Sequence, residues 1–410
     1  MHRYEAKFKP GVGTLPEPRK GMNHLTPLLV LLSMILPRAS LAQGGETLKN
    51  RMNELHSILL NLNADLAKDL PFPGSPQHQR VEVRMERFSS LAHRITARTE
   101  DTGMGQLLPI LGEALPEQAD QMTSSWKLGQ TAYARGVFRT LSATCLECHA
   151  ANGPKSPVTP RIQETDLSAW NPIDRGRYLR SAGLAEKAYE EFKRVITRPG
   201  TVPDLTLTLE DALYELLSLE IGTSGSPERV VQVIRPLLER DDLPRYLKTD
   251  LAGWIRDLDT WKREGFSKPK KNGTTQLKTA RSHLRKAKAL QESPTDRSSL
   301  VWYWRAVAEL YGTLKENLRM EQRAEALFLL GSAFEVLTPR HQETLHERLY
   351  EACIHALPHT PRSDLCYRKL ERSVIAGYTG SAGTRVPEEV RKRLLELWGT
   401  AFLKKGLELR

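Results

Sequence analysis

The sequence predicts an all-α protein, with a four-helix bundle followed by a degenerate α-solenoid of helix hairpins. Glycine and proline clusters divide the 410 residues into pieces of helix length. Almost no stretch alternates apolar and polar residues with a period of two, which argues against strands. Apolar residues instead recur three and four positions apart, as they do along the buried face of a helix.

Residues 1–42 are expected to be a leader and a secretory signal peptide. Residues 25–36, LTPLLVLLSMIL, form an apolar stretch that follows basic residues and precedes small ones. This stretch is too short for a comfortable membrane span. We therefore expect cleavage after Ala42 and export to the periplasm, with membrane association only if the segment stays uncleaved. Met22 is an alternative start to Met1 because the residues between them carry no core pattern.

Residues 43–155 are expected to form the bundle. The first helix should span residues 46–70, with a lengthwise seam of Leu48, Met52, Leu55, Leu59, Leu62 and Leu66. Further helices are expected over residues 77–96, 105–115 and 117–150, and their short connections make neighbouring helices antiparallel. One broad apolar face of the fourth helix should carry Trp126, Tyr133, Val137, Phe138, Leu141, Cys145 and Cys148.

A Cys-x-x-Cys-His motif lies at the end of that fourth helix, at Cys145, Cys148 and His149. With 4 Cys and 11 His in the chain, chance would produce it about once in a thousand shuffled sequences. Zinc would need two more ligands at similar spacing, and a redox disulfide would need its first cysteine at a helix start. Covalent attachment of one haem c uses every residue: two thiols for the vinyl groups and an imidazole for the iron.

The N-terminal region resembles the cytochrome c′ and cytochrome c-556 family over residues 45–155. VFRTLSATCLECHAANG is similar to the last helix of that family, and LKNRMNELHSILLNL to its first, with Arg51 where the family often has a basic residue. The resemblance implies a four-helix bundle with its haem motif at the end of the last helix. The more familiar cytochrome c fold is a rival, but it usually places its motif early and a methionine ligand downstream. Here no methionine follows the motif before Met320.

Three residues of the first helix compete for the sixth position of the iron. In an antiparallel bundle the start of the first helix lies beside the end of the fourth, so Met52 and His149 are expected at the same end. The Met52 thioether and the His56 imidazole are both competent axial ligands. Alignment of Arg51 on the family pattern instead places Leu55 over the iron, which implies an open sixth position.

Residues 156–172 are proline-rich and are interpreted as a linker to a helical-repeat domain, residues 173–410. Residues 174–200 resemble a tetratricopeptide unit, with Gly176, Ala188 and Phe192 at the family spacing and Pro199 closing the second helix. Further helices are expected around residues 210–222, 227–240, 246–261, 298–314, 321–337, 343–357, 364–378 and 388–402. Such arrays offer a concave surface to a protein partner.

The repeat region also holds features that have competing interpretations. Trp302, Tyr303 and Trp304 fit core packing better than a docking hot spot. The basic residues 268–288 fit a solvated linker and helix face better than a nucleic-acid site. Solvent-facing positions are expected, rather than metal binding, for His341, His346, His355 and His359.

Cys353 and Cys366 lie near the facing ends of two predicted helices. In an oxidising compartment they form either a disulfide across the helix hairpin or two buried thiols.

These observations together predict an exported mono-haem c-type cytochrome that acts in electron transfer. The expected partners are a redox protein and a protein docked on the repeats; neither nucleic acid nor catalysis is indicated. A haem-based gas or redox sensor, or a haem-bearing interaction scaffold, is the alternative. Axial ligation separates them, because an open sixth position admits small ligands such as NO or CO.

Overall fold

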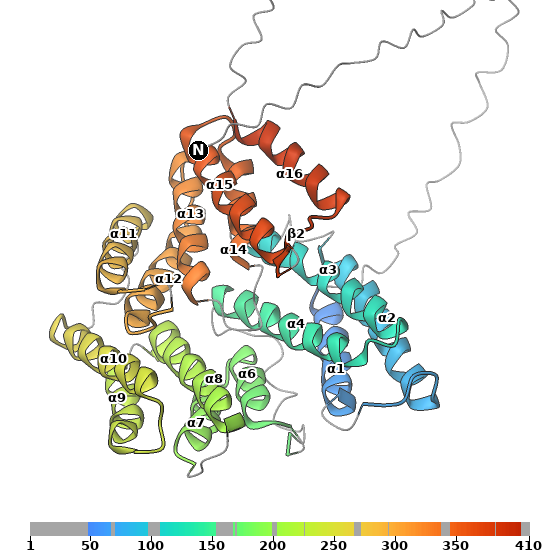
Figure 1. Ribbon diagram of the computed structural model, residues 1–410, viewed down its shortest axis with the longest axis horizontal. Helices are drawn as coiled ribbons and strands as arrows, with labels where there is room; N and C mark the ends of the chain where they lie inside the picture. Colours follow the sequence, from blue (N-terminus) through green and yellow to red (C-terminus); the bar gives the residue numbers. More distant parts are fainter. Residues whose placement is uncertain are drawn as a thin grey trace, which may run out of the picture. The chain divides into compact units, whose positions relative to one another are not determined.

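The protein is all α in the computed structural model (Figure 1). The structure describes residues 48–66, 70–96, 107–152, 167–168, 170–198, 203–224, 226–265, 272–293, 295–337, 345–381 and 383–402. Within these ranges the chain is almost entirely helical, and strands occur only as the short antiparallel hairpin of β1 (Thr379–Gly380) and β2 (Gly383–Thr384). The expected signal segment lies outside the described residues. No described helix is long and apolar enough to cross a membrane.

The first four helices pack in sequence order, each against the next. They are α1 (Leu48–Leu66), α2 (Pro76–Thr96), α3 (Leu107–Lys127) and α4 (Thr131–Asn152). The predicted seam of α1 is confirmed for Leu55, Leu59, Leu62 and Leu66, which are all buried, whereas Met52 is half-buried against the same core. They join a core with Met85, Phe88, Met122, Trp126 and Phe138.

The expected boundary between the third and fourth helices is wrong. The third helix does not end at residue 115, because Pro116 lies inside α3, and the chain turns at Gly129. Buried residues on both sides of Pro116, among them Leu111, Met122 and Trp126, keep one apolar stripe against the core. This packing offsets the roughly 3 kcal/mol cost of a proline in a helix. Gly129 ends α3 with a φ of 75° and donates its N–H to the carbonyl of Trp126, as a C-terminal glycine does.

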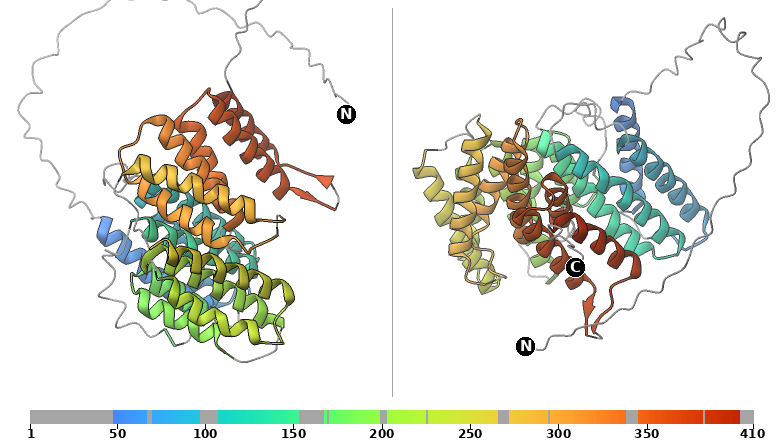
Figure 2. Two further views of the ribbon diagram at one scale, coloured as in Figure 1. Left: turned by 90° about the vertical axis from the view of Figure 1, so that its left-hand side faces the viewer. Right: turned by 90° about the horizontal axis from the view of Figure 1, so that it is seen from above.

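The remaining helices follow one another as packed hairpins (Figure 2). They are α6 (Pro172–Ser181), α7 (Ala185–Ile196), α8 (Pro203–Leu219), α9 (Pro227–Ile234), α10 (Arg245–Arg263), α11 (Gly273–Leu290), α12 (Leu300–Leu314), α13 (Met320–Leu337), α14 (Leu345–Ala356), α15 (Pro361–Gly377) and α16 (Glu388–Ala401). A π-helical turn, Glu220–Ser224, extends α8, and a 3-10 turn, Arg235–Glu239, extends α9. Of the basic residues 268–288, those from Gly273 onward lie in α11, which buries Leu277, Ala280 and Leu284, and residues 268–271 lie outside the described residues.

The packing of α6 on α7 bears out the residue spacing seen in the sequence. Ala188 and Phe192 are fully buried, and the Phe192 ring lies directly over Gly176. A side chain at Gly176 would collide with that ring, so the helices approach closely only because glycine stands there. Pro199 lies outside the described residues.

Trp302, Tyr303 and Trp304 belong to the core, as expected. Their exposed fractions are 1%, 0% and 6%. A docking hot spot at these residues is therefore excluded, because α12 is covered by α10, α11 and α13.

The helices on the two sides of the predicted linker contact each other. Helix α4 packs on α6, and α3 contacts α14, where Arg348 donates to Glu117 at 2.5 Å. Residues 46–410 form one compact unit. The linker itself falls mostly outside the described residues. That the helices after it fold independently of the first four stays a prediction.

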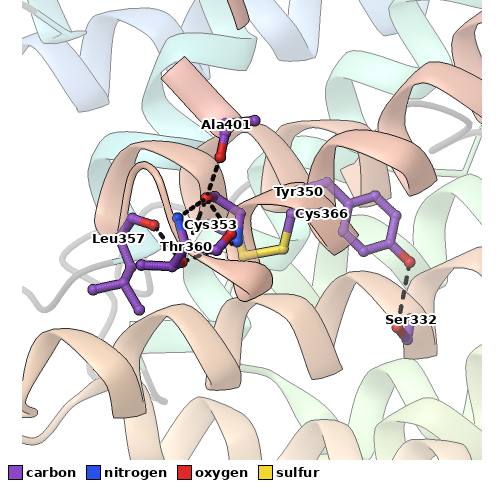
Figure 3. The surroundings of a disulfide bond; sticks show 8 residues. Ser332, Tyr350, Cys353, Leu357, Thr360, Cys366 and Ala401 are labelled. Atoms are coloured by element: carbon purple, nitrogen blue, oxygen red, sulfur yellow. Dashed lines mark hydrogen bonds between the residues drawn. A yellow bond between two sulfur atoms is a disulfide. The ribbon is translucent and has the colours of Figure 1, made fainter. Parts of the chain in front are cut away.

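Cys353 of α14 and Cys366 of α15 form a disulfide across the helix hairpin (Figure 3). Both residues are fully buried. Thr360 caps α15 by accepting a hydrogen bond from the backbone of Ser363, whose hydroxyl in turn donates to the carbonyl of Ala401 at 2.7 Å. The disulfide thus lies where α14, α15 and the end of α16 meet.

Candidate functional site

The backbone of the Cys-x-x-Cys-His motif lies in the last turns of α4. The Cys145 side chain is half-buried and forms no disulfide. The side chains of Cys148 and His149 lie outside the described residues. The expectation that the motif ends the fourth helix of the chain is confirmed, although that helix begins at Thr131 instead of residue 117.

Helix α4 directs two different faces toward its surroundings. Ala134, Val137, Phe138 and Leu141 are buried against the core at the spacing of one helix face. The hydroxyl of Thr144 adds a buried hydrogen bond of 2.8 Å to Gln118 of α3. Tyr133 was expected on the apolar face but is 53% exposed, where it accepts a hydrogen bond from Gln121.

The neighbouring face of α4 lines a cleft of about 180 Å³. Arg135, Arg139, Ser142 and Cys145 follow one another along this face at helical spacings. The opposite walls come from α1, the segment before α6, and α6, through Leu59, Leu66, Trp170 and Tyr178. Cys145 therefore lies beside a pocket with aromatic and aliphatic walls and a cationic edge.

Three arginines line the cleft, and Arg135 and Arg139 of α4 differ from Arg177 of α6 in their ion-pair partners. Among the described residues, no ion-pair partner is found for Arg135 or Arg139. Arg177, in contrast, donates to Glu215 at 2.6 Å. Burial alone would lower the pKa of Arg177, but the charge and hydrogen bond of Glu215 outweigh it and raise that pKa. The arginines of α4 are thus the ones available to an anionic group.

The three candidates for the sixth iron position occupy different environments on α1. Met52 is half-buried and packs against the core, whereas Leu55 is buried with 5% exposed. His56 points to α6, where its Nε2 lies 2.6 Å from the hydroxyl oxygen of Tyr178. Arg51 is also buried and donates to the carbonyl of Arg94 at 2.6 Å. The side chains of His56 and Arg51 are thus both hydrogen-bonded to other residues of the protein.

The residues of the cleft fit a haem in chemistry but do not enclose one. A thiol outside any disulfide, aromatic walls, and arginines with no ion-pair partner among the described residues match the vinyl group, the macrocycle and the propionates of a haem. Pockets that enclose drug-sized ligands measure roughly 300–1,000 Å³. A cleft of about 180 Å³ would admit a haem only after α1 and α6 had moved away from α4.

The described histidines of the C-terminal helices lie in different surroundings. No group of three or more His, Cys, Asp or Glu in the described ranges could hold an ion, and His341 lies outside them. His355 and His359 are exposed, as expected. His346 was expected to face solvent but is buried, with its Nε2 2.6 Å from the hydroxyl oxygen of Ser373. Burial lowers the pKa of His346.

Two residues of the cleft were missed in the sequence. Trp170 lies in the predicted linker and Tyr178 lies beyond it, and their rings pack together with centroids 5.1 Å apart. Tyr178 also stacks on His56. Nothing in the local pattern of residues 170–178 indicates a contact with the cysteine motif, because that contact is made only by the packing of α6 on α4.

The chain matches no protein-family model, no curated protein and no solved structure.

Proposed function

We propose that this protein is an exported mono-haem c-type cytochrome that acts in electron transfer and not as an enzyme. Its N-terminal helices would form a four-helix bundle of the cytochrome c′ and c-556 kind, and its later helices a degenerate α-solenoid that docks a partner protein. The observation that carries the proposal is the Cys-x-x-Cys-His motif at the end of α4, where Cys145, which forms no disulfide, lies beside a cleft with aromatic and aliphatic walls.

Cys145 and Cys148 would hold the haem through thioether bonds, with His149 as the proximal ligand of the iron. A haem bound in this way supplies one-electron transfer at its iron. The chain contributes the apolar walls of Leu59, Phe138 and Trp170 beside the half-buried thiol. Arg135 and Arg139 contribute positive charge at the edge of the cleft.

The contact between His56 and Tyr178 favours a second candidate, a haem-based gas or redox sensor or a haem-bearing scaffold. It joins a possible iron ligand on α1 to the first helix of the repeats. A change in the packing of α6 would therefore move Tyr178 and alter both the cleft and the position of His56. An open sixth position would support the sensor, because small ligands could then bind.

The test is an absorption spectrum of the protein expressed in the periplasm, reduced with and without CO. A c-type haem spectrum that persists after acid–acetone extraction is the expected result, since thioether bonds survive that treatment. Cys145→Ser should weaken the covalent attachment, whereas Ser142→Ala on the same face of α4 should not. An apoprotein of unchanged polypeptide mass, from cells that mature other c-type cytochromes, would refute the haem assignment.

A further inference from the structure

The last helix, α16, has exposed apolar side chains beside the face that packs on the rest of the protein. Leu394, Leu397 and Ala401 are buried where α16 contacts α14 and α15. Leu395 and Trp398, in contrast, are 69% and 51% exposed. A helical array normally ends in a polar outer face, because an apolar face there attracts other molecules. The outer side of α16 does not have that polar character.

These exposed residues belong to one stripe along the helix. Arg391, Leu395, Trp398 and Phe402 are spaced four, three and four positions apart, which places them on one side of α16 and its C-terminal end. Seam residues of two helices that pack lengthwise have this spacing. The stripe therefore has the pattern of a surface that packs against another helix.

The aromatic end of the stripe is held in place by the loop before α15. The backbone N–H of His359 donates to the carbonyl of Thr400 at 3.1 Å, and its Nδ1 lies 2.7 Å from the carbonyl oxygen of Phe402. The Phe402 ring packs on Trp398 and on Tyr367, with centroids 5.3 and 5.5 Å away. Aromatic side chains that are fixed before binding make good interface anchors, because little entropy is lost when they bind.

The two ends of this part of α16 are chemically complementary. Arg391 and Lys392 are exposed at one end, and Trp398 exposes its indole ring at the other. Arg391 pairs with Glu388 of the same helix, whereas Lys392 has no ion-pair partner among the described residues. An ammonium group is attracted to the face of an indole ring. Lys392 and Trp398 are about 9 Å apart along the helix axis, so this contact is available only between two molecules.

We infer that α16 packs antiparallel against α16 of a second copy of this chain, about a two-fold axis near Leu395. Positions 392 and 398 lie equally far from Leu395, so Lys392 of each copy meets Trp398 of the other, and every contact occurs twice. Parallel packing is disfavoured, because it would place the cations of one copy beside those of the other. The inference does not depend on the proposed haem.

The test is sedimentation velocity of the full chain from low micromolar to submillimolar concentration. One helix face is smaller than the roughly 1,200–2,000 Å² of a stable interface, so we expect a dimer that dissociates on dilution. The double variant Leu395→Ser with Trp398→Ser should stay monomeric. The matched control, Phe72→Ser with Leu128→Ser, removes an aromatic residue and a leucine that are 85% and 74% exposed among the first four helices, and it should associate like the parent.

The contact between Lys392 and Trp398 is tested separately. Lys392→Gln should weaken association about fivefold, because two cation–π contacts are lost in each dimer. Lys187→Gln, which removes an exposed lysine of α7, should leave association unchanged. In a Trp398→Ser background, Lys392→Gln should have no further effect. Unchanged helical circular dichroism of the variants excludes misfolding.

A chain that stays monomeric at every concentration would overturn the inference. Equal loss of association in both double variants would overturn it as well, because it would show a general attraction between apolar surfaces. The antiparallel arrangement fails if Lys392→Gln associates like the parent. Quenching of Trp398 fluorescence by iodide tests another occupant of the stripe: if deletion of residues 403–410 exposes Trp398 to iodide at low concentration, the end of the same chain covers the stripe and the inference fails.

Discussion

The imidazole of His56 lies 2.6 Å from the hydroxyl oxygen of Tyr178 and stacks on its ring, with centroids 5.4 Å apart and planes 8° from parallel. The two residues are 122 positions apart in the chain. This contact engages Nε2 of His56 with a protein partner and directs the side chain toward α6. His56 is thus the one of the three residues considered for the sixth iron position whose side chain has a hydrogen-bond partner on α6.

Met52→Ala should therefore change the haem environment more than His56→Ala. With Met52 as the sixth ligand, its loss should abolish a weak ferric band near the red edge of the spectrum and open the reduced haem to CO. His56→Ala should leave both properties as they are. The reverse pattern would identify His56 as the ligand, and no effect of either variant would indicate the open site under Leu55.

Gly176→Ala should destabilise the protein. The new methyl group would collide with the Phe192 ring, and overpacking of this kind costs about 1 to 3 kcal/mol. Gly136→Ala is the matched control, because Gly136 is an exposed glycine of α4 with open space around its Cβ position. That change should stabilise the helix by about 0.5–1 kcal/mol. Urea unfolding followed by circular dichroism measures both, and equal effects would contradict the packing described for α6 and α7.

Reduction of the disulfide between Cys353 and Cys366 should lower the free energy of unfolding. The bond closes a short loop with a sequence separation of 13, for which about 3 kcal/mol is expected. The paired variant Cys353→Ala with Cys366→Ala should lose a similar amount and become insensitive to reductant. If the oxidised parent and its reduced form unfold at the same urea concentration, the bond contributes nothing to stability.

Stability should fall as the pH rises from about 4.5 to about 7 because of Glu309 in α12. Burial raises the pKa of Glu309 to about 7, although Arg305 acts in the opposite direction. The folded state then holds a proton that the unfolded state has released, so the stability present below pH 4.5 is lost by pH 7. The loss should be about 1 to 2 kcal/mol, since solvent screens this partly exposed carboxyl.

Glu309→Gln should remove this part of the pH dependence, and the exposed Glu321→Gln should not. Urea unfolding at pH 5, 6, 7 and 8 measures the difference between the variants. An unchanged slope in Glu309→Gln would assign the pH dependence to other groups.

The helical elements were largely predictable from the sequence, because local apolar periodicity determines them. The seam of α1 and the spacing of Gly176, Ala188 and Phe192 are examples. The end of α3 was not predictable in the same way. A proline usually ends a helix, and only the three-dimensional packing of Met122 and Trp126 shows why α3 continues past Pro116.

The candidate site was predictable only in part. The cysteine motif is a local pattern, and its place at the end of α4 followed from the sequence. Its neighbours Trp170 and Tyr178 come from the end of the predicted linker and from the helix after it, so no helical period connects them to Cys145. His346 shows the same limit, because it is buried in contact with Ser373 of another helix.

The ion pair between Arg348 and Glu117 has a consequence for the order in which the chain folds. It joins residues 231 positions apart, a much longer loop than any helix hairpin closes. Since loop closure becomes slower and more costly with sequence separation, the contact between α3 and α14 should form late. If the chain is exported from its N-terminus, as proposed, α4 emerges before α14. The proposed attachment of haem at Cys145 would then precede the contact between α3 and α14.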